Sequence, residues 1–190
     1  MKQYKVKIKG KTPYMQHRMD DQTLEDWEKN RGKIIERKEV AQEDYKRALF
    51  HSYNNGDGQF YMPSEHLRGS FINGGKMVKS KVGNSRRSMA NIVAGMFFIK
   101  EDKLPLPDNW EIDKRSAVNK NIKARVISIR PKWVDWNVEF TLEVDNDTIT
   151  DETTKAVIEN AGKYIGIGSF RPEHNGMFGR FEIEKFELIQ

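Results

Sequence analysis

The sequence predicts an α+β fold in which helices cover an antiparallel sheet. Apolar and polar residues alternate near both ends of the chain and over 124–144, which is the period of half-buried strands. Two other stretches, 23–50 and 150–162, have the spacing of amphipathic helices. The resulting order of strand, helix, strand, strand, helix, strand is typical of a ferredoxin-like sheet with its helices on one face.

The N-terminal part supplies the first strand and the first helix. The strand alternates lysine with larger apolar residues, namely Tyr4, Val6 and Ile8, and ends near Gly10. Thr23 is a candidate N-cap, because acidic residues follow it in a first helical turn. Gly32 interrupts the helical pattern of 23–50, so this segment is compatible with one helix or two.

The middle of the chain is less regular. An Asn-Asn-Gly-Asp-Gly turn lies within 51–62, and Pro63 opens a short helix that runs towards Gly74 and Gly75. The basic, glycine-interrupted segment 76–87 is expected to be a mobile loop, and 88–99 is apolar enough for a buried helix or strand. We therefore predict a single domain of residues 1–190. Its core is about 1–22 and 110–190, and a helical, basic insertion occupies about 23–109.

The C-terminal part returns to regular elements. The strands 124–130 and 136–144 are expected to pair as a hairpin. A capped helix over 150–162 follows, and 180–189 alternates as a closing strand.

A glycine-rich loop, GIGSFRPEHNGMFGR, connects that helix to the closing strand at residues 166–180. Its spacing does not match GxGxxG, and the loop contains no phosphate-loop GK[ST]. Nucleotide-binding loops lie before a helix, whereas this loop follows one, so that the negative end of the helix faces it. The order of elements favours a tight turn from helix to strand over a phosphate cradle.

The terminal helix, the loop of the form GIG…R…GMFGRF and the closing strand together resemble the C-terminal signature of the repeat-associated (RAMP) proteins of CRISPR effector complexes. The opening strand ending in TPYM and the late hairpin are similar too, so that the resemblance covers roughly 1–18 and 110–190. It implies an RRM-like core that binds single-stranded nucleic acid, often along a filament of like subunits. A backbone subunit of an effector complex and a standalone, phage-type relative are both open.

The charge distribution points to the same kind of partner. Residues 66–132 carry 15 Lys and Arg against 5 Asp and Glu, whereas 133–190 carry 5 against 12. Such a basic block predicts a surface that binds the phosphates of single-stranded RNA or DNA. The candidate contacts are Arg18, Arg68, Lys76, Lys79, Lys81, Arg86, Arg87, Arg115, Lys120, Lys123, Arg125, Phe170 and Arg171. The alternative is a solvated basic face that pairs with the acidic C-terminal part or with another protein, as in a structural protein-interaction module.

Single-strand binding also needs rings on which bases stack. The candidates are Tyr14, Phe60, Tyr61, Trp133, Trp136 and Phe170. Because alternating strands bury most of their aromatic residues, we expect only a minority of these rings to stack on bases.

Catalysis is the second hypothesis. The four histidines have no metal-ligand spacing, so we expect no metal and no cofactor. His17 and Asp21 follow the first strand and flank Arg18, which offers the acid, base and cation of a metal-independent ribonuclease. Relatives with endonuclease activity, as the resemblance implies, use a histidine or an aspartate in this loop. We expect a non-catalytic, cytoplasmic protein that has no cysteine and no membrane span.

Overall fold

The computed structural model describes residues 1–18, 44–56, 58–82, 85–119, 124–145 and 149–189. The side chains of 80–82, 85–87, 118, 119, 124 and 126 are also left undescribed. Asp21, Lys120, Lys123 and most of the helix predicted over 23–50 therefore lie outside the described residues.

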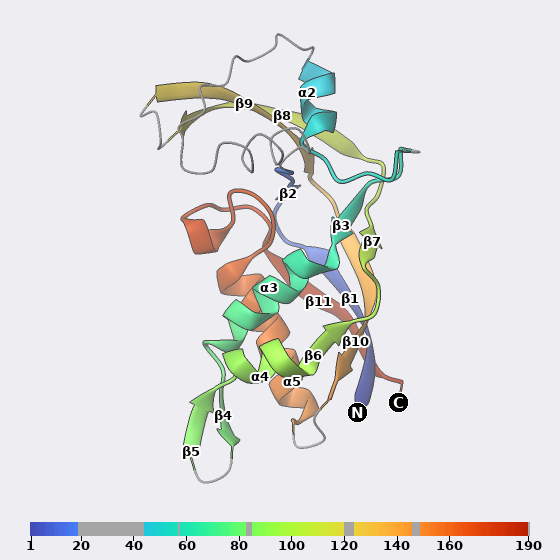
Figure 1. Ribbon diagram of the computed structural model, residues 1–190, viewed down its shortest axis with the longest axis vertical. Coiled ribbons are helices and arrows are strands. Elements are labelled where there is room, and N and C mark those ends of the chain that lie inside the picture. Colours follow the sequence, from blue (N-terminus) through green and yellow to red (C-terminus); the bar gives the residue numbers. More distant parts are fainter. Residues whose placement is uncertain (19–43, 57, 83–84, 120–123, 146–148, 190) are drawn as a thin grey trace, which may run out of the picture.

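A four-stranded antiparallel sheet forms the centre of the molecule, in the order β11-β1-β10-β6 (Figure 1). Its strands are β1 (Lys2–Gly10), β6 (Phe97–Ile99), β10 (Asn137–Val144) and β11 (Phe181–Leu188). The two helices that pack together over one face are α3 (Ser64–Gly75) and α5 (Asp151–Asn160). Along the chain this gives strand, helix, strand, strand, helix, strand, so the predicted ferredoxin-like α+β fold is confirmed.

Two of these elements come from other residues than the sequence predicted. The first covering helix is α3 and the second strand is β6, both inside the segment 23–109 that was expected to be an insertion. Conversely, residues 110–119 and 124–133 lie outside the four-stranded sheet. They form β8 (Trp110–Asn119) and β9 (Ala124–Trp133), a long hairpin that projects from one end of the molecule (Figure 1).

The predicted hairpin of 124–130 with 136–144 is wrong. Strand β9 pairs with β8 and with the short β2 (Tyr14–Met15), while β10 pairs with β1 and β6. The connection 131–135 contains none of the Gly or Asn residues that a tight hairpin turn prefers. The chain instead runs on from β9 into β10 without reversing (Figure 1), and Trp136, in the connection between these strands, is buried.

The remaining elements flank this core. Helix α2 (Asp44–Phe50) packs on the β8–β9 hairpin, and β3 (Tyr61–Pro63) pairs with β7 (Lys103–Pro105). The segment expected to be a mobile loop is a hairpin of β4 (Lys79–Val82) and β5 (Ser85–Ser88). Helix α4 (Ala90–Met96) leads directly into β6, so the apolar run 88–99 supplies both a helix and a strand.

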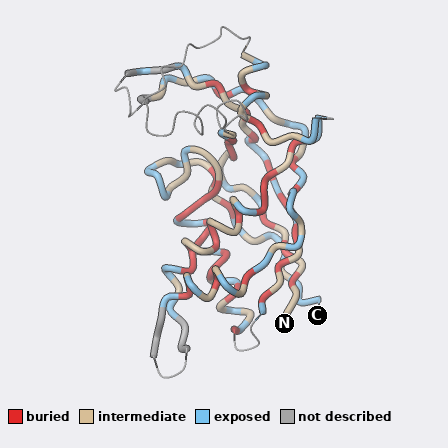
Figure 2. The backbone as a smooth tube through the Cα atoms, viewed as in Figure 1, coloured by how far each residue is buried: buried red, intermediate tan, exposed pale blue. Residues whose placement is uncertain are grey.

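The core lies between the sheet and its helices, where Figure 2 shows the buried residues concentrated. Tyr4, Val6 and Ile8 of β1 all point into it, as their alternation predicted. The ring of Phe71 from α3 lies 6.0 Å from that of Phe140 in β10. No helix within the described ranges is long and apolar enough to cross a membrane.

The opposite face of the sheet is covered by cross-strand ion pairs. Lys5 lies 3.0 Å from Glu139, Lys7 lies 2.8 Å from Glu184, and Lys100 lies 3.0 Å from Glu143. Phe98, opposite Glu143 in the register, adds an exposed ring at the edge. RRM domains carry base-stacking aromatic residues in the middle of this face, where this chain has lysines and glutamates.

Candidate nucleic-acid interface

The glycine-rich loop folds back tightly on itself between α5 and β11. A single π-helical turn, η1 (Ala161–Ile165), leads into it, and Gly166, Gly168 and Gly179 have positive φ angles. A Cβ on Gly179 would overlap the carbonyl oxygen of Ile167, whose own amide donates to the Gly179 carbonyl at 3.0 Å. The predicted tight turn is therefore confirmed, because backbone approaches of this kind leave no room for a side chain.

The outer side of this loop presents a pair of aromatic rings. Phe170 has φ +59°, which is uncommon for a residue other than glycine, and is 41% exposed. Its ring is nearly perpendicular to that of Phe178, with 5.5 Å between the centroids. The guanidinium of Arg115, on β8, lies 5.4 Å from the Phe170 centroid and 4.9 Å from the Phe178 centroid. Cation–π contacts thus join the loop to the β8–β9 hairpin.

Further cations surround this contact. Arg115 donates to both carboxylate oxygens of the buried Asp113, and these hydrogen bonds raise the pKa of the Arg115 guanidinium. Arg130 of β9 donates to Ser169 Oγ at 2.6 Å. Burial lowers the pKa of Arg130, with a smaller contribution from Arg115 in the same direction. Lys132 is also 3.7 Å from Asp113, and Arg130 is opposite Asp113 in the strand register, so three cations lie around one buried carboxylate. We call Arg115, Arg130, Phe170 and Phe178 the loop–hairpin surface.

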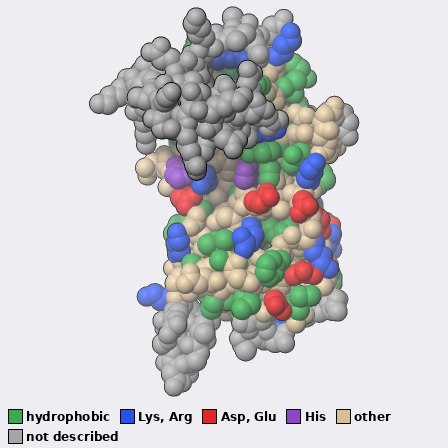
Figure 3. Space-filling model, viewed as in Figure 1, with side chains coloured by type: hydrophobic (Ala, Val, Ile, Leu, Met, Phe, Trp, Pro, Cys, Tyr) green, Lys and Arg blue, Asp and Glu red, His purple; other side chains and the backbone are tan. Residues whose placement is uncertain are grey.

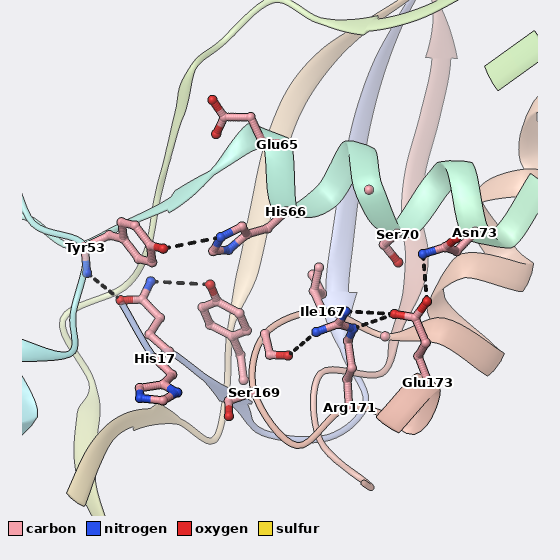
Figure 4. Close-up of a pocket in the computed structure, with 15 residues that line it drawn as sticks. His17, Tyr53, Glu65, His66, Ser70, Asn73, Ile167, Ser169, Arg171 and Glu173 are labelled. Carbon is pink, nitrogen blue, oxygen red and sulfur yellow. Dashed lines mark hydrogen bonds and ion pairs between the residues drawn. The ribbon is translucent and has the colours of Figure 1, made fainter. Parts of the chain in front are cut away.

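A cleft of about 420 Å³ lies on the inner side of the same loop, between it and α3 (Figure 4). One face of α3 lines it through residues spaced three and four apart, as helix geometry requires: Glu65, His66, Gly69, Ser70 and Asn73. The loop contributes Arg171 and Glu173, while His17 and Tyr53 lie at the end near β2. Figure 3 shows histidine side chains exposed beside acidic and basic ones about midway along the molecule.

The charged groups of the loop in this cleft pair with one another. Arg171 Nε lies 2.9 Å from a carboxylate oxygen of Glu173, and its Nη1 donates to the Gly168 carbonyl at 3.1 Å. The other oxygen of Glu173 accepts from the Asn73 amide at 2.7 Å, which ties the loop to α3. Arg171, predicted to contact phosphate, is thus engaged within the fold.

Two polar atoms of α3 have no such partner. His66 Nδ1 and Ser70 Oγ are buried and make no hydrogen bond, although His66 Nε2 lies 3.5 Å from the Tyr53 hydroxyl. Burial, and to a smaller degree Arg171, lowers the pKa of His66, while Glu65 opposes the shift. The ring is therefore neutral at pH 7, with one nitrogen a donor and the other an acceptor.

Among the predicted basic residues whose side chains the structure describes, several lie far apart. Lys76 and Lys79 are exposed beside the β4–β5 hairpin, at the end of the molecule opposite β8 and β9 (Figure 1). Arg68 donates to the Ala94 carbonyl and so joins α3 to α4. Arg125 is exposed on β9. Strands β4 and β5 also contain Lys81, Arg86 and Arg87, whose side chains lie outside the described part.

The residues after the first strand lie at the mouth of the cleft. His17 is exposed, and its ring meets that of His51 edge-on with 4.9 Å between the centroids. The Arg18 amide donates to the His51 carbonyl at 3.0 Å.

Most of the aromatic candidates belong to the core. Tyr14, Phe60, Trp133 and Trp136 are buried, and Tyr61 is half-buried beneath Lys103, which leaves Phe170 as the exposed ring of the set. Sequence reasoning missed Phe178, His66 and Ser70. The spacing of four between His66 and Ser70 around Gly69 is a signal that could have revealed the concave helix face.

Comparison with known proteins shows little beyond this. No family model matches the chain, and no curated protein matches it. Among solved structures, a chain of the Type III-B Cmr-beta complex bound to cognate target RNA is similar, with 11% identity and a TM-score of 0.49. The match covers 100% of this chain and 61% of that one. Membership of the RAMP family therefore stays a prediction from the sequence.

Proposed function

We propose that the protein binds single-stranded nucleic acid, without cleaving it, at the loop–hairpin surface. The observation that carries the proposal is the exposed ring of Phe170, held in a left-handed backbone conformation beside Phe178 and Arg115. Such a conformation costs about 1–3 kcal/mol and persists where the surrounding structure imposes it, often at binding sites. A base stacked on an exposed ring contributes about 1–3 kcal/mol, which is comparable.

The charges around Phe170 support the same proposal. Arg115, Arg130 and Lys132 carry three positive charges around the single carboxylate of Asp113, and Glu111 pairs with Lys132 at 2.6 Å. Three cations thus accompany two carboxylates, so the net charge of this group is positive. Arg115, one of these cations, lies directly beside the two rings. Single-strand binders combine a basic groove for the backbone with aromatic platforms for the bases. Binding at such a surface weakens as salt rises, because each phosphate contact releases counterions.

The open face of the sheet is a poorer candidate. Its lysines already pair with glutamates, as Lys5 does with Glu139 and Lys7 with Glu184. A nucleic acid that lay there would meet those carboxylates and would have to break the pairs. Phe98, at the edge of that face, supplies a matched control, since it is the same residue type and 43% exposed.

The test is fluorescence anisotropy with labelled strands of about 12 nucleotides, a length that covers one site. Single-stranded RNA, single-stranded DNA and duplex are compared at about 50 mM and about 200 mM salt. We expect Phe170→Ala to weaken single-strand binding about 5- to 100-fold, whereas Phe98→Ala leaves it unchanged. A lack of binding to any strand at low salt would reject nucleic-acid binding and favour a protein-interaction module. If only Phe98→Ala weakens single-strand binding, the binding site lies on the open face of the sheet instead.

Metal-independent RNA cleavage is the second candidate, and the position of His17 favours it. Its exposed ring lines the cleft, so an acid–base group faces the same space as the ion pair of Arg171 with Glu173. Histidine is suited to proton transfer near neutral pH. The test is to incubate labelled RNA in the presence of a chelator with wild type and with His17→Ala. Cleavage by wild type that His17→Ala lacks would support this activity, and RNA that stays intact with both proteins would exclude it.

We also propose, from the resemblance of the glycine loop, that subunits assemble along the bound strand. Light scattering with and without a long single strand tests it. A mass that grows with strand length supports assembly, while one subunit per strand at every length rules it out.

A further inference from the structure

We infer that the cleft between α3 and the glycine-rich loop is a pocket for one nucleobase. The inference rests on the proposed function for the source of the base, which is the strand bound at the loop–hairpin surface. Three neighbouring features suggest it. Small residues leave a hollow on α3, two buried polar atoms of the lining residues have no partner, and an exposed ring lies on the outer side of the glycine-rich loop.

The shape of the cleft suits a flat ring. Gly69 lies at the middle of the α3 face, and a Cβ added there would meet nothing within 4 Å. The neighbouring Ser70 is also small, so the helix presents a hollow between Glu65 and Asn73. At about 420 Å³ the cleft is within the size range of small-molecule sites. The aromatic side chains of Tyr53 and His17 lie at one end of it (Figure 4).

The polar atoms of the cleft suit a neutral ligand with both donors and acceptors. Ser70 is only 4% exposed, yet its hydroxyl has no partner, and neither has Nδ1 of the neighbouring His66. Buried polar groups in native proteins are nearly always hydrogen-bonded, so two unpartnered ones, four residues apart on the same helix, indicate a missing partner. A hydroxyl both donates and accepts, and a neutral imidazole offers one or the other. The edge of a base has the complementary groups.

A phosphate fits the cleft less well than a base does. The guanidinium that lines it, that of Arg171, is neutralised by Glu173 at 2.8 Å. Glu65 also lines the cleft, but Figure 4 shows its carboxylate pointing away from the other labelled side chains. The pKa of His66 is lowered by burial, so its ring does not supply a positive charge at pH 7. A phosphate would therefore have to compete with Glu173 for the Arg171 guanidinium, whereas an uncharged base needs no cation.

The pocket is also correctly placed relative to the stacking ring. Ser169 lines the cleft and at the same time accepts a hydrogen bond from Arg130 of the loop–hairpin surface. The next residue along the chain, Phe170, is exposed on the outer side. A strand whose backbone crosses the loop at Ser169 has one base near Phe170 and a neighbouring base near the cleft.

The experiment fills the cleft without disturbing the surface outside it. Gly69→Leu places a side chain in the hollow, and Gly95→Leu is the matched control, since a Cβ on Gly95 of α4 also meets nothing within 4 Å. Anisotropy is measured with oligo-A, oligo-C, oligo-U and an abasic strand of the same length. We expect Gly69→Leu to weaken binding of at least one base-bearing strand about tenfold and to leave the abasic strand unchanged. Gly95→Leu should match wild type throughout.

If the two leucine variants bind every strand equally well, the inferred base pocket is wrong. The proposed function can still stand in that case, provided that Phe170→Ala weakens binding. If Gly69→Leu fails to fold by circular dichroism, Ser70→Ala takes its place with the same expectation at about fivefold, the effect of one hydrogen bond. Free nucleosides added to ¹⁵N-labelled protein distinguish the source of the base. If nucleosides cause saturable chemical-shift changes at the Gly69 and Ser70 amides but the protein binds no strand, the pocket is supported and the proposed function is rejected.

Discussion

Replacing Ser70 by alanine should make the protein more stable. The Ser70 hydroxyl is buried in α3 without a hydrogen-bond partner, and an unsatisfied buried hydroxyl costs about 1–3 kcal/mol. Alanine also exceeds serine in helix propensity by about 0.5 kcal/mol. Because only one atom is lost and no contact with a partner is broken, we expect the unfolding free energy to rise by about 1–2 kcal/mol. The corresponding increase in Tm is about 4 °C for a chain of this size.

Ser52→Ala is the matched control for this measurement. Ser52 is 0% exposed, but its Oγ donates to the Leu49 carbonyl at 2.6 Å and accepts from Asn54 at 2.9 Å. Its removal should lower the unfolding free energy by about 1–2 kcal/mol, because Asn54 loses its acceptor. Urea denaturation of both variants gives the comparison. If Ser70→Ala destabilises the protein as much as Ser52→Ala does, the Ser70 hydroxyl has a partner in the fold and the polar argument for the base pocket fails.

Three further predictions concern other parts of the fold. Gly168→Ala should lower the unfolding free energy by about 2 kcal/mol, since Gly168 has φ +77° and an added Cβ would lie 2.6 Å from the Tyr14 ring; an unchanged urea midpoint would contradict this reading of the loop. Burial lowers the pKa of His66 in the folded state, so below the ordinary value of about 6.5 the unfolded chain takes up a proton that the fold resists. The unfolding free energy should therefore fall as the pH drops from 7 to 5.5, and His66→Asn should reduce this pH dependence. An equal pH dependence in both proteins would show that other groups cause it. Thr150→Ala should lower stability by about 1 kcal/mol in thermal melts, because the Thr150 hydroxyl caps α5 by accepting from the Thr153 amide at 3.2 Å; an unaltered Tm would show that the cap is dispensable.

The sequence predicted those parts of the fold that depend on neighbouring residues. Alternation in β1, the Thr150 cap of α5 and the glycines of the loop are local signals, and each is found where it was expected. Strand pairing is not local. The alternation of 124–130 correctly indicates a strand, but nothing in it distinguishes β8 from β10 as the partner.

The candidate site was less accessible from the sequence, because net charge counts cations without their partners. Arg115 is bound to Asp113, Lys114 lies 2.7 Å from Asp44, and Arg171 is held by Glu173. Cations of the basic block such as Lys114 and Arg115 are thus neutralised within the fold, and so is Arg171 outside it. Burial likewise decides which rings are available, and it removes Trp133 from the stacking candidates while it leaves Phe170 exposed. Both effects arise from contacts between residues far apart in the chain.

The most direct test of the central claim is photocrosslinking of a single strand that contains 4-thiouridine, followed by mapping of the crosslinked peptides. If the strand lies on the loop–hairpin surface, the crosslinks should fall in the glycine-rich loop around Phe170 and Phe178 and in β8 around Arg115. They should disappear at about 1 M salt, where phosphate contacts are screened. Crosslinks confined to β1 and β10, on the open face of the sheet, would contradict the account.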